Sequence, residues 1–260
     1  MEQKVLVVGE NSFIAKHLKY DKISYTDFKN FDLTRYDVVV NCALNPSYKS
    51  QKYDESIDVD LDVGIRACSK SLHYIMLSSS KVYGNNHKLK TYTEDDPIDP
   101  YDFHSENKAL TEQKLLTSFP NQTTILRGSN IFGYEPGRDS FTGYCIKQLI
   151  EKNIIELTID KNTTRDFLPV ATASDIINLV VRYQPTGVYN LSSGVGITVD
   201  DFIKILISGY NNNTKIIYKD SKPDRQFILN NEKLLRRVMA LYNDKLIYTE
   251  IQDIGILCKI

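Results

Sequence analysis

Short apolar runs alternate with amphipathic segments through the first half of the sequence, and this alternation limits the possible folds more than any other feature. Runs rich in β-branched residues, typical of buried strands, cover residues 4–9, 22–26, 37–43, 74–80 and 123–128. Helical spacing of apolar residues lies between them, at 12–20, at 54–71 (with Ile57, Leu61 and Ile65 on one face) and from about His104 onward. This order predicts an α/β fold with a doubly wound parallel sheet covered by helices on both faces.

The second half of the sequence has shorter elements and longer connections. We predict helices at 141–152, 171–183 and 199–210, and strands at 187–193 and 215–219. Residues 1–130 would then form the sheet domain. Residues 131–260 would form mainly a small α/β lobe, with part of 166–192 returning to the sheet. Ligands of open α/β folds bind beyond the carboxyl ends of the strands, so we expect this lobe to bind the substrate there.

The charge balance and the cysteines exclude several classes of protein. The formal net charge is −1, from 32 basic and 33 acidic residues scattered along the chain, so neither nucleic acid nor an anionic membrane is an expected partner. The start of the sequence has no signal-peptide pattern, and no apolar run approaches the roughly 20 residues that span a bilayer. No cysteine spacing suggests a disulfide framework or a metal site. We therefore expect a cytoplasmic protein with reduced thiols and no metal.

A glycine turn follows the first predicted strand. The stretch "VLVVGENSFIA" has the pattern Gly9-x-x-Ser12-x-x-Ala15, in which Gly9 permits a tight turn, Ser12 a close approach and Ala15 helix–strand packing. Backbone N–H groups in such a turn, with the positive end of a following helix dipole, bind a pyrophosphate. The pattern therefore predicts a Rossmann-like dinucleotide site with these cofactor-binding residues: Gly9, Asn11, Ser12, Phe13 and Ile14. An ordinary strand–helix turn is the alternative.

Later segments extend the pattern. The segments, in chain order, are "VGENSFIAKHL", "DL" at 32–33, "VVNCAL", "SSSKVYG", "HSENKALTE", "LRGSNIFG" and "RDFLPV". In this order they resemble the motifs of the extended short-chain dehydrogenase/reductase family, in particular its nucleotide-sugar epimerases, dehydratases and 4-ketoreductases. The resemblance covers most of the chain, and "SSSKVYG" and "LRGSNIFG" are its most specific parts. It implies that Asp32 and Leu33 contact the adenine and that Cys42 and Ala43 lie under the cofactor.

The choice between NAD and NADP rests on the residues around the second strand. Asp27 would accept a hydrogen bond from the ribose 2′-hydroxyl and favour NAD, whereas Lys22 or Lys29 would meet the 2′-phosphate of NADP. Reductases of the family commonly use NADPH, so NADP is the preferred expectation and NAD the alternative.

The resemblance assigns a catalytic group with one departure. Ser79 would hold the sugar oxygen, and Lys108 would bind the nicotinamide ribose and tune the acid/base. The residue four before Lys108 is His104, where the family has Tyr. Because one helical turn brings the two side chains together, we predict His104 as the acid/base. A histidine that only packs or caps the helix start is the alternative, and Tyr83 and Tyr101 are the other candidates for the acid/base.

The resemblance also implies a substrate site, with the following residues near a nucleotide-diphosphate sugar: Ser80, Lys81, Asn130, Arg165 and Arg225. Only 27 residues (10–36) separate Gly9 from Asp37, as in the shorter reductases of the family. The first expectation is therefore NAD(P)H-dependent reduction of the C4 ketone of a 4-keto-6-deoxy sugar, for polysaccharide or glycoconjugate synthesis. The alternatives are a 4-epimerase with tightly bound NAD and a non-catalytic nucleotide-binding protein. A homodimer through residues 55–70 and 104–118 is also expected.

Overall fold

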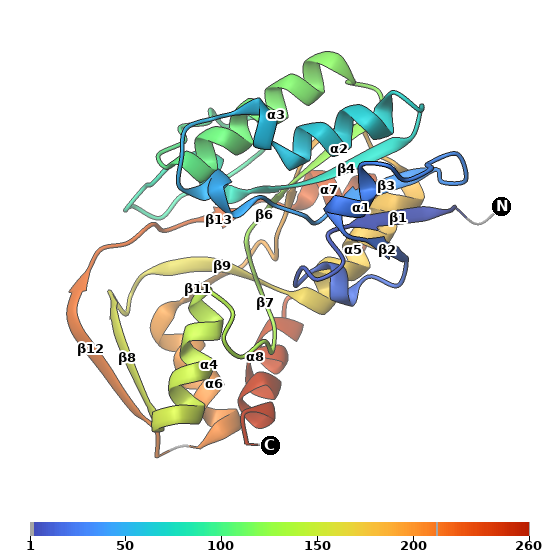
Figure 1. The fold of residues 1–260 in the computed structure, drawn as a ribbon. Coiled ribbons are helices and arrows are strands. Elements are labelled where there is room, and N and C mark those ends of the chain that lie inside the picture. The colour runs from blue at the N-terminus through green and yellow to red at the C-terminus, as the bar shows by residue number, and fades with distance from the viewer. Residues whose placement is uncertain (1–2, 212, 260) are drawn as a thin grey trace.

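The protein is built on one six-stranded parallel sheet (Figure 1). A computed structural model describes residues 3–211 and 213–259. The strand order is β10-β6-β4-β3-β1-β2. The bounds are β1 Val5–Val8, β2 Asp21–Ile23, β3 Val38–Asn41, β4 His73–Ser79, β6 Thr123–Gly128 and β10 Gly187–Leu191. The predicted doubly wound parallel sheet is confirmed.

The sheet separates two apolar cores, which explains why consecutive residues of its central strands are apolar. Along β1, Val5 and Val7 belong to one core and Leu6 and Val8 to the other. The first core lies under α5 (Val170–Tyr183) and α7 (Glu232–Arg237). The second lies under α2 (Val59–Cys68) and α3 (Phe103–Ser118), on the opposite face of the sheet in Figure 1. Both faces are therefore dry, as in other sheets of this class.

Two sequence-based predictions about the first helices are wrong. The helix expected at 12–20 is a single 3₁₀ turn, η1 (Ala15–His17). Residues 9–20 must return the chain to the start of β2, and extended backbone covers this distance with fewer residues than an α-helix. The expected strand at 22–26 ends at Ile23, because Ser24 caps the short helix α1 (Tyr25–Phe28).

The helix expected at 54–71 is present, but its buried face is rotated. It consists of a 3₁₀ turn, η3 (Glu55–Ile57), followed by α2. Ile65, predicted to point inward, is 41% exposed, while Val59, Val63 and Ala67 are buried. Asp60 is buried in the same stripe. The rotation thus brings a carboxylate to the interior.

The second half forms a lobe around a third core. The predicted helices at 141–152 and 199–210 are α4 (Phe141–Lys152) and α6 (Val199–Tyr210), and the predicted helix at 171–183 is α5. The remaining elements are η2 Pro46–Lys49, η4 Ser80–Tyr83, β5 Thr91–Tyr92, β7 Asn130–Phe132, β8 Ile154–Ile159, β9 Thr164–Pro169, β11 Gly196–Thr198, β12 Lys215–Lys222, β13 Ile228–Leu229 and α8 Leu246–Leu257. None of the described helices is long and apolar enough to cross a membrane.

The lobe lies beside the carboxyl end of the sheet. β6 runs into β7, and β10 runs into β11, so two sheet strands enter the lobe directly (Figure 1). β10 itself pairs in parallel with β6 at the edge of the main sheet. The lobe therefore follows directly from the carboxyl ends of two neighbouring strands of the sheet.

Candidate active site

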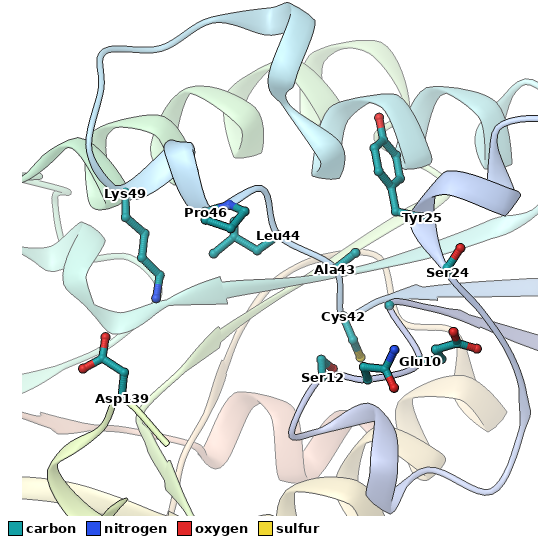
Figure 2. Close-up of a pocket in the computed structure, with 12 residues that line it drawn as sticks. Glu10, Ser12, Ser24, Tyr25, Cys42, Ala43, Leu44, Pro46, Lys49 and Asp139 are labelled. Atoms are coloured by element: carbon teal, nitrogen blue, oxygen red, sulfur yellow. The ribbon is translucent and has the colours of Figure 1, made fainter. Parts of the chain in front are cut away.

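Two adjoining cavities lie at the carboxyl ends of β1, β3 and β4. The larger has a volume of about 630 Å³ and the smaller about 320 Å³, a range typical of ligand pockets. Figure 2 shows the larger one. They form one cleft, because they share Ser12, Cys42, Ala43, Leu44 and Lys49. Every predicted residue of the glycine turn lines the cleft, as do Cys42 and Ala43.

The turn after β1 is built for a close approach of the backbone. Gly9 has a φ of +91°, and its N–H donates to the carbonyl of Ile23 at 2.9 Å. A Cβ at this position would lie 2.5 Å from the backbone nitrogen of Ala43. Ser12 Oγ accepts a hydrogen bond from the N–H of Ala15, the first residue of the 3₁₀ turn, at 3.2 Å. The residues present therefore fit a dinucleotide, with backbone N–H groups rather than a long helix dipole facing its phosphates.

Replacing Gly9 with Ala is expected to weaken dinucleotide binding at least tenfold and to lower the free energy of unfolding by about 2 kcal/mol, because it adds a clash to an unfavourable φ. Gly187→Ala is the matched control, since Gly187 also has a positive φ (+103°) but nothing lies within 4 Å of its added Cβ. Calorimetric titration and urea unfolding measure the two effects. Equal losses in both variants would contradict the role of the close contact with Ala43.

The predicted adenine-contacting pair does not lie in the cleft. Both carboxylate oxygens of Asp32 accept hydrogen bonds from Thr34, from its N–H at 3.0 Å and its hydroxyl at 2.9 Å. The side chain of Leu33 is buried in the core beneath α2. Neither residue lines either cavity. Ser24 and Tyr25, which follow β2, lie in the cleft instead.

The predicted catalytic residues come together. Ser79 ends β4, and His104 and Lys108 lie one turn apart at the start of α3; all three line the smaller cavity. α3 begins where it does because the side chain of Asp102 accepts a hydrogen bond from the N–H of Ser105 at 2.8 Å. The hydroxyl oxygen of Ser79 accepts a hydrogen bond from the N–H of Lys81 at 3.2 Å, which leaves its proton available to a ligand. Within the described ranges, neither ring nitrogen of His104 has a hydrogen-bond partner.

Lys108 is held by a partner that the sequence did not reveal. Its ammonium donates to Asp60 Oδ2 at 2.6 Å and to the carbonyl of Leu77 at 2.8 Å. Asp60 Oδ1 in turn accepts a hydrogen bond from Asn41 at 2.8 Å. An ammonium has three N–H bonds, so one of them remains for a ligand in the cavity.

Glu112, four residues after Lys108 on the same helix, does not pair with it. Glu112 forms a buried ion pair with Arg127 at 2.7 Å and accepts a hydrogen bond from Ser78. Glu112 lies one turn beyond Lys108 on α3, where it faces β6 rather than the cavity.

The imidazole of His104 lies in an environment that keeps it neutral. Burial lowers the pKa of His104 to about 4, and the positive charges of Lys108 and Lys81 act in the same direction. The carboxylate of Asp102 opposes them but does not cancel them. At neutral pH the ring therefore has one nitrogen with a free lone pair, and it is suited to accept a proton.

The tyrosines that were the alternatives to His104 lie elsewhere. Tyr83 is buried, and its hydroxyl donates to the amide oxygen of Asn190 at 2.8 Å. Tyr101 precedes the cap of α3 and is 40% exposed. Neither lines the cleft, so of the three candidates only His104 lines the cavity together with Ser79 and Lys108.

The predicted substrate residues are engaged within the protein. Arg225 donates to the carbonyl of Gly84 at 2.7 Å and to the hydroxyl of Ser80 at 3.2 Å, and burial lowers its pKa to about 10. Both side chains therefore fasten the turn after β4. The ammonium of Lys81 pairs with Asp102 at 2.7 Å.

The two predicted phosphate contacts from the lobe are also engaged. Asn130 donates to the carbonyl of Asp166 at 3.0 Å, and Arg165 forms an ion pair with Asp224. Neither lines the cleft. Arg138, which sequence reasoning missed, does line it: its guanidinium lies 3.9 Å from the ring centroid of Phe13 and donates to the carbonyl of Ile131 at 3.0 Å. The one signal for Arg138 in the sequence was its position in the polar turn "YEPGRDS".

The doubly wound sheet, the turn at Gly9 and the cleft at the strand ends together define a dinucleotide-binding α/β protein. A sequence profile described as the NAD dependent epimerase/dehydratase family matches residues 9–192. The chain belongs to this family, and the resemblance inferred from its motifs is confirmed. No curated protein matches the chain.

Solved structures of similar fold cover nearly the whole chain. UDP-N-acetylglucosamine 4-epimerase from Methanobrevibacter ruminantium M1, in complex with UDP-N-acetylmuramic acid, is 18% identical with a TM-score of 0.84, and the match covers 98% of each chain. dTDP-glucose 4,6-dehydratase from Bacillus anthracis, in complex with NAD, is 18% identical with a TM-score of 0.81, covering 98% of this chain and 96% of that one. RMD from Pseudomonas aeruginosa, complexed with NADPH, is 18% identical with a TM-score of 0.75, covering 98% and 99%. At these identities the likeness shows a shared fold.

Proposed function

We propose that this protein is an NAD(P)-dependent enzyme that acts at C4 of a nucleotide-diphosphate sugar, and that it epimerises this carbon. The observation that carries the proposal is the neutral imidazole of His104, which lines a cavity together with Ser79 and Lys108. Membership of the NAD dependent epimerase/dehydratase family supports the reaction class. The fold shared with a UDP-N-acetylglucosamine 4-epimerase supports the substrate class.

The glycine turn and Lys108 would hold the cofactor. Gly9, Asn11 and Ser12 line the larger cavity and would face its phosphates, while the free N–H of Lys108 would reach the ribose next to the nicotinamide. When bound, a nicotinamide dinucleotide accepts a hydride from a sugar carbon and returns one to it.

The protein's own residues would move the proton. A ring nitrogen of His104 takes the proton from the C4 hydroxyl as the C–H bond is broken, and Ser79 donates a hydrogen bond to the oxygen that becomes the ketone. The imidazolium then returns the proton when hydride is delivered to the other face of C4. The cycle consumes no net proton, so it suits an imidazole that starts neutral.

One-way reduction, the first expectation from the sequence, starts from the opposite protonation state. It requires a proton donor, and with a pKa of about 4 only about one His104 in a thousand is protonated at pH 7. The short connection between Gly9 and Asp37 still favours a reductase. Reduction of a 4-keto-6-deoxy sugar is therefore the second candidate.

The test is to incubate the purified protein with UDP-, dTDP- and GDP-sugars and their 4-keto-6-deoxy derivatives, each with NAD or NADPH. Interconversion of C4 epimers without net cofactor consumption would support the proposal. Stoichiometric cofactor oxidation by a 4-keto sugar would support the reductase. Cofactor binding with no turnover on any substrate would contradict both and favour a non-catalytic nucleotide-binding protein.

The proton-accepting role predicts a low acid limit of activity. Because His104 must be unprotonated, kcat/KM is expected to be constant at neutral pH and to fall tenfold per unit only below about pH 4. The folded-state pKa lies below the unfolded value of 6.5, so this group's contribution to stability is lost as the pH falls from about 6.5 to 4. Circular dichroism at each pH separates unfolding from catalysis. An acid limit near pH 7 in folded protein would contradict this environment.

The homodimer through residues 55–70 and 104–118 stays a prediction. Each of these two segments has one exposed large apolar side chain among the described residues, Ile65 on α2 and Leu110 on α3. Analytical ultracentrifugation measures the oligomeric state directly.

A further inference from the structure

The larger cavity has two ends of different chemistry. Figure 2 shows Glu10 on the same side as Ser24 and Tyr25, whereas Lys49 and Asp139 face one another at the far side. Ser12, Cys42 and Ala43 lie between the two ends (Figure 2). The middle is thus the place for the phosphates, and the end with Glu10 is the place for the ribose beyond them.

The backbone of Glu10 is held at the end of the second strand. The N–H groups of Gly9 and Glu10 both point to the carbonyl of Ile23, the last residue of β2, at 2.9 and 3.4 Å. In dinucleotide-binding folds the adenosine ribose lies at the end of this strand, where a carboxylate accepts hydrogen bonds from its hydroxyls. In this protein the carboxylate at this place, Glu10, comes from the turn after β1 and not from the end of β2.

The other polar groups at this end already have partners. The hydroxyl of Ser24 donates to Asp27 Oδ2 at 2.7 Å, and the hydroxyl of Tyr25 donates to Asp62 at 3.1 Å. Asp27, the carboxylate expected to bind the ribose, is therefore occupied and does not line the cavity. Within residues 3–211 and 213–259, no hydrogen bond or ion pair holds the carboxylate of Glu10.

No cation among the described residues lines this end of the larger cavity. Lys49 is the only cation among the described residues that line the larger cavity, and it lies at the opposite end (Figure 2). Lys22 and Lys29, which would meet a 2′-phosphate, do not line it, and the ammonium of Lys29 lies 5.1 Å from the ring centroid of Tyr25. A 2′-phosphate would thus meet a carboxylate and no facing cation.

We propose that Glu10 accepts hydrogen bonds from the 2′- and 3′-hydroxyls of the adenosine ribose and thereby selects NAD over NADP. The proposal rests on the proposed cofactor cleft and reverses the preference for NADP that the reductase motifs suggested. Vicinal hydroxyls match the two oxygens of a carboxylate, whereas a phosphate at the 2′ position removes one donor and brings like charges together.

The test measures dissociation constants of NADH and NADPH by fluorescence titration for the wild type, Glu10→Gln and Lys29→Gln. NADH is expected to bind the wild type at least tenfold more tightly than NADPH. Glu10→Gln is expected to reduce this ratio about tenfold, the effect of one or two charge-assisted hydrogen bonds. Glu10 is exposed, so its replacement should leave the melting temperature unchanged.

A second pair of ligands isolates the hydroxyl contact. ADP is expected to bind the wild type more tightly than 2′-deoxy-ADP, and Glu10→Gln is expected to bind both equally. Asp139→Asn is the matched control, because it removes a carboxylate from the other end of the same cavity and should leave both ratios unchanged.

Three outcomes would overturn the inference. Tighter binding of NADPH to the wild type, lost in Lys29→Gln, would assign the 2′ position to Lys29. Ratios that are the same in Glu10→Gln and the wild type would show that Glu10 does not read the ribose. Binding of neither dinucleotide would contradict the cofactor cleft itself, and with it the proposed function.

Discussion

Replacing His104 with Asn is expected to lower kcat about a thousandfold while the affinity for the dinucleotide stays within a factor of about three. Proton transfer by a positioned side chain contributes about 10²–10⁴ to the rate, and His104 is the group placed for it beside Ser79 and Lys108. The partly exposed side chain has no hydrogen-bond partner among the described residues, so its loss leaves no buried polar group unpaired. Steady-state kinetics and a dinucleotide titration measure the two quantities.

Three further variants make this prediction specific. Tyr83→Phe and Tyr101→Phe are expected to keep kcat within about threefold of the wild type, because neither ring lines the cleft. His104→Tyr restores the residue that the family has at this position, one turn before Lys108. It is expected to recover much of the rate, with its acid limit at a higher pH than in the wild type, because a phenol ionises near pH 10. A wild-type kcat in His104→Asn would show that another group moves the proton.

The parts of the site that depend on spacing along one element were predictable from the sequence. His104 and Lys108 lie one turn apart on a helix, so their separation fixes their proximity wherever the helix packs. Gly9 directly follows a buried strand, and its turn is a local property. The strands of the sheet were predictable for a similar reason, since short runs such as Val38–Val40 are β-branched and apolar at consecutive positions.

The parts that depend on packing between elements were not predictable. Asp60 reaches Lys108 because α2 is rotated relative to the face marked by Ile57, Leu61 and Ile65. In the sequence it is one of three alternating aspartates in "DVDLDVG", which resemble solvated carboxylates. Arg165 looked available for phosphate in the sequence, but its partner Asp224 lies 59 residues later. The low pKa of His104 likewise needs burial, which periodicity does not give at a helix start.

These long-range partners also explain why the site differs from the one its motifs imply. The ammonium of Lys108 is compensated by Asp60, while the carboxylate of Asp102, which caps the helix, does not cancel the lowering of the pKa of His104. On α3, Lys108 is thus the residue whose charge is paired, and His104 is the residue proposed to transfer the proton. The stability of the site should therefore depend on the first pair, and its chemistry on the histidine.

Breaking the pair of Asp60 and Lys108 is expected to lower the free energy of unfolding by about 3–5 kcal/mol, because it leaves a buried charge without a partner. The side chains of Lys108 and Asp60 are 7% and 1% exposed. Asp60→Ala and Lys108→Met should each show this loss in urea unfolding. Lys114→Ala is the matched control, since Lys114 of α3 pairs with Glu55 of η3 at 40% and 61% exposure, and its loss should cost less than about 1 kcal/mol.

The double variant Asp60→Ala/Lys108→Met decides whether charge pairing is the cause. With both charges removed, the loss is expected to be several kcal/mol smaller than the sum of the two single losses, because no charge is left buried and unpaired. Dinucleotide affinity should remain low in the double variant, since the ammonium that faces the ribose is absent. Strictly additive losses would mean that Asp60 and Lys108 stabilise the fold through separate contacts, and the ammonium would then reach the cavity without the help of Asp60.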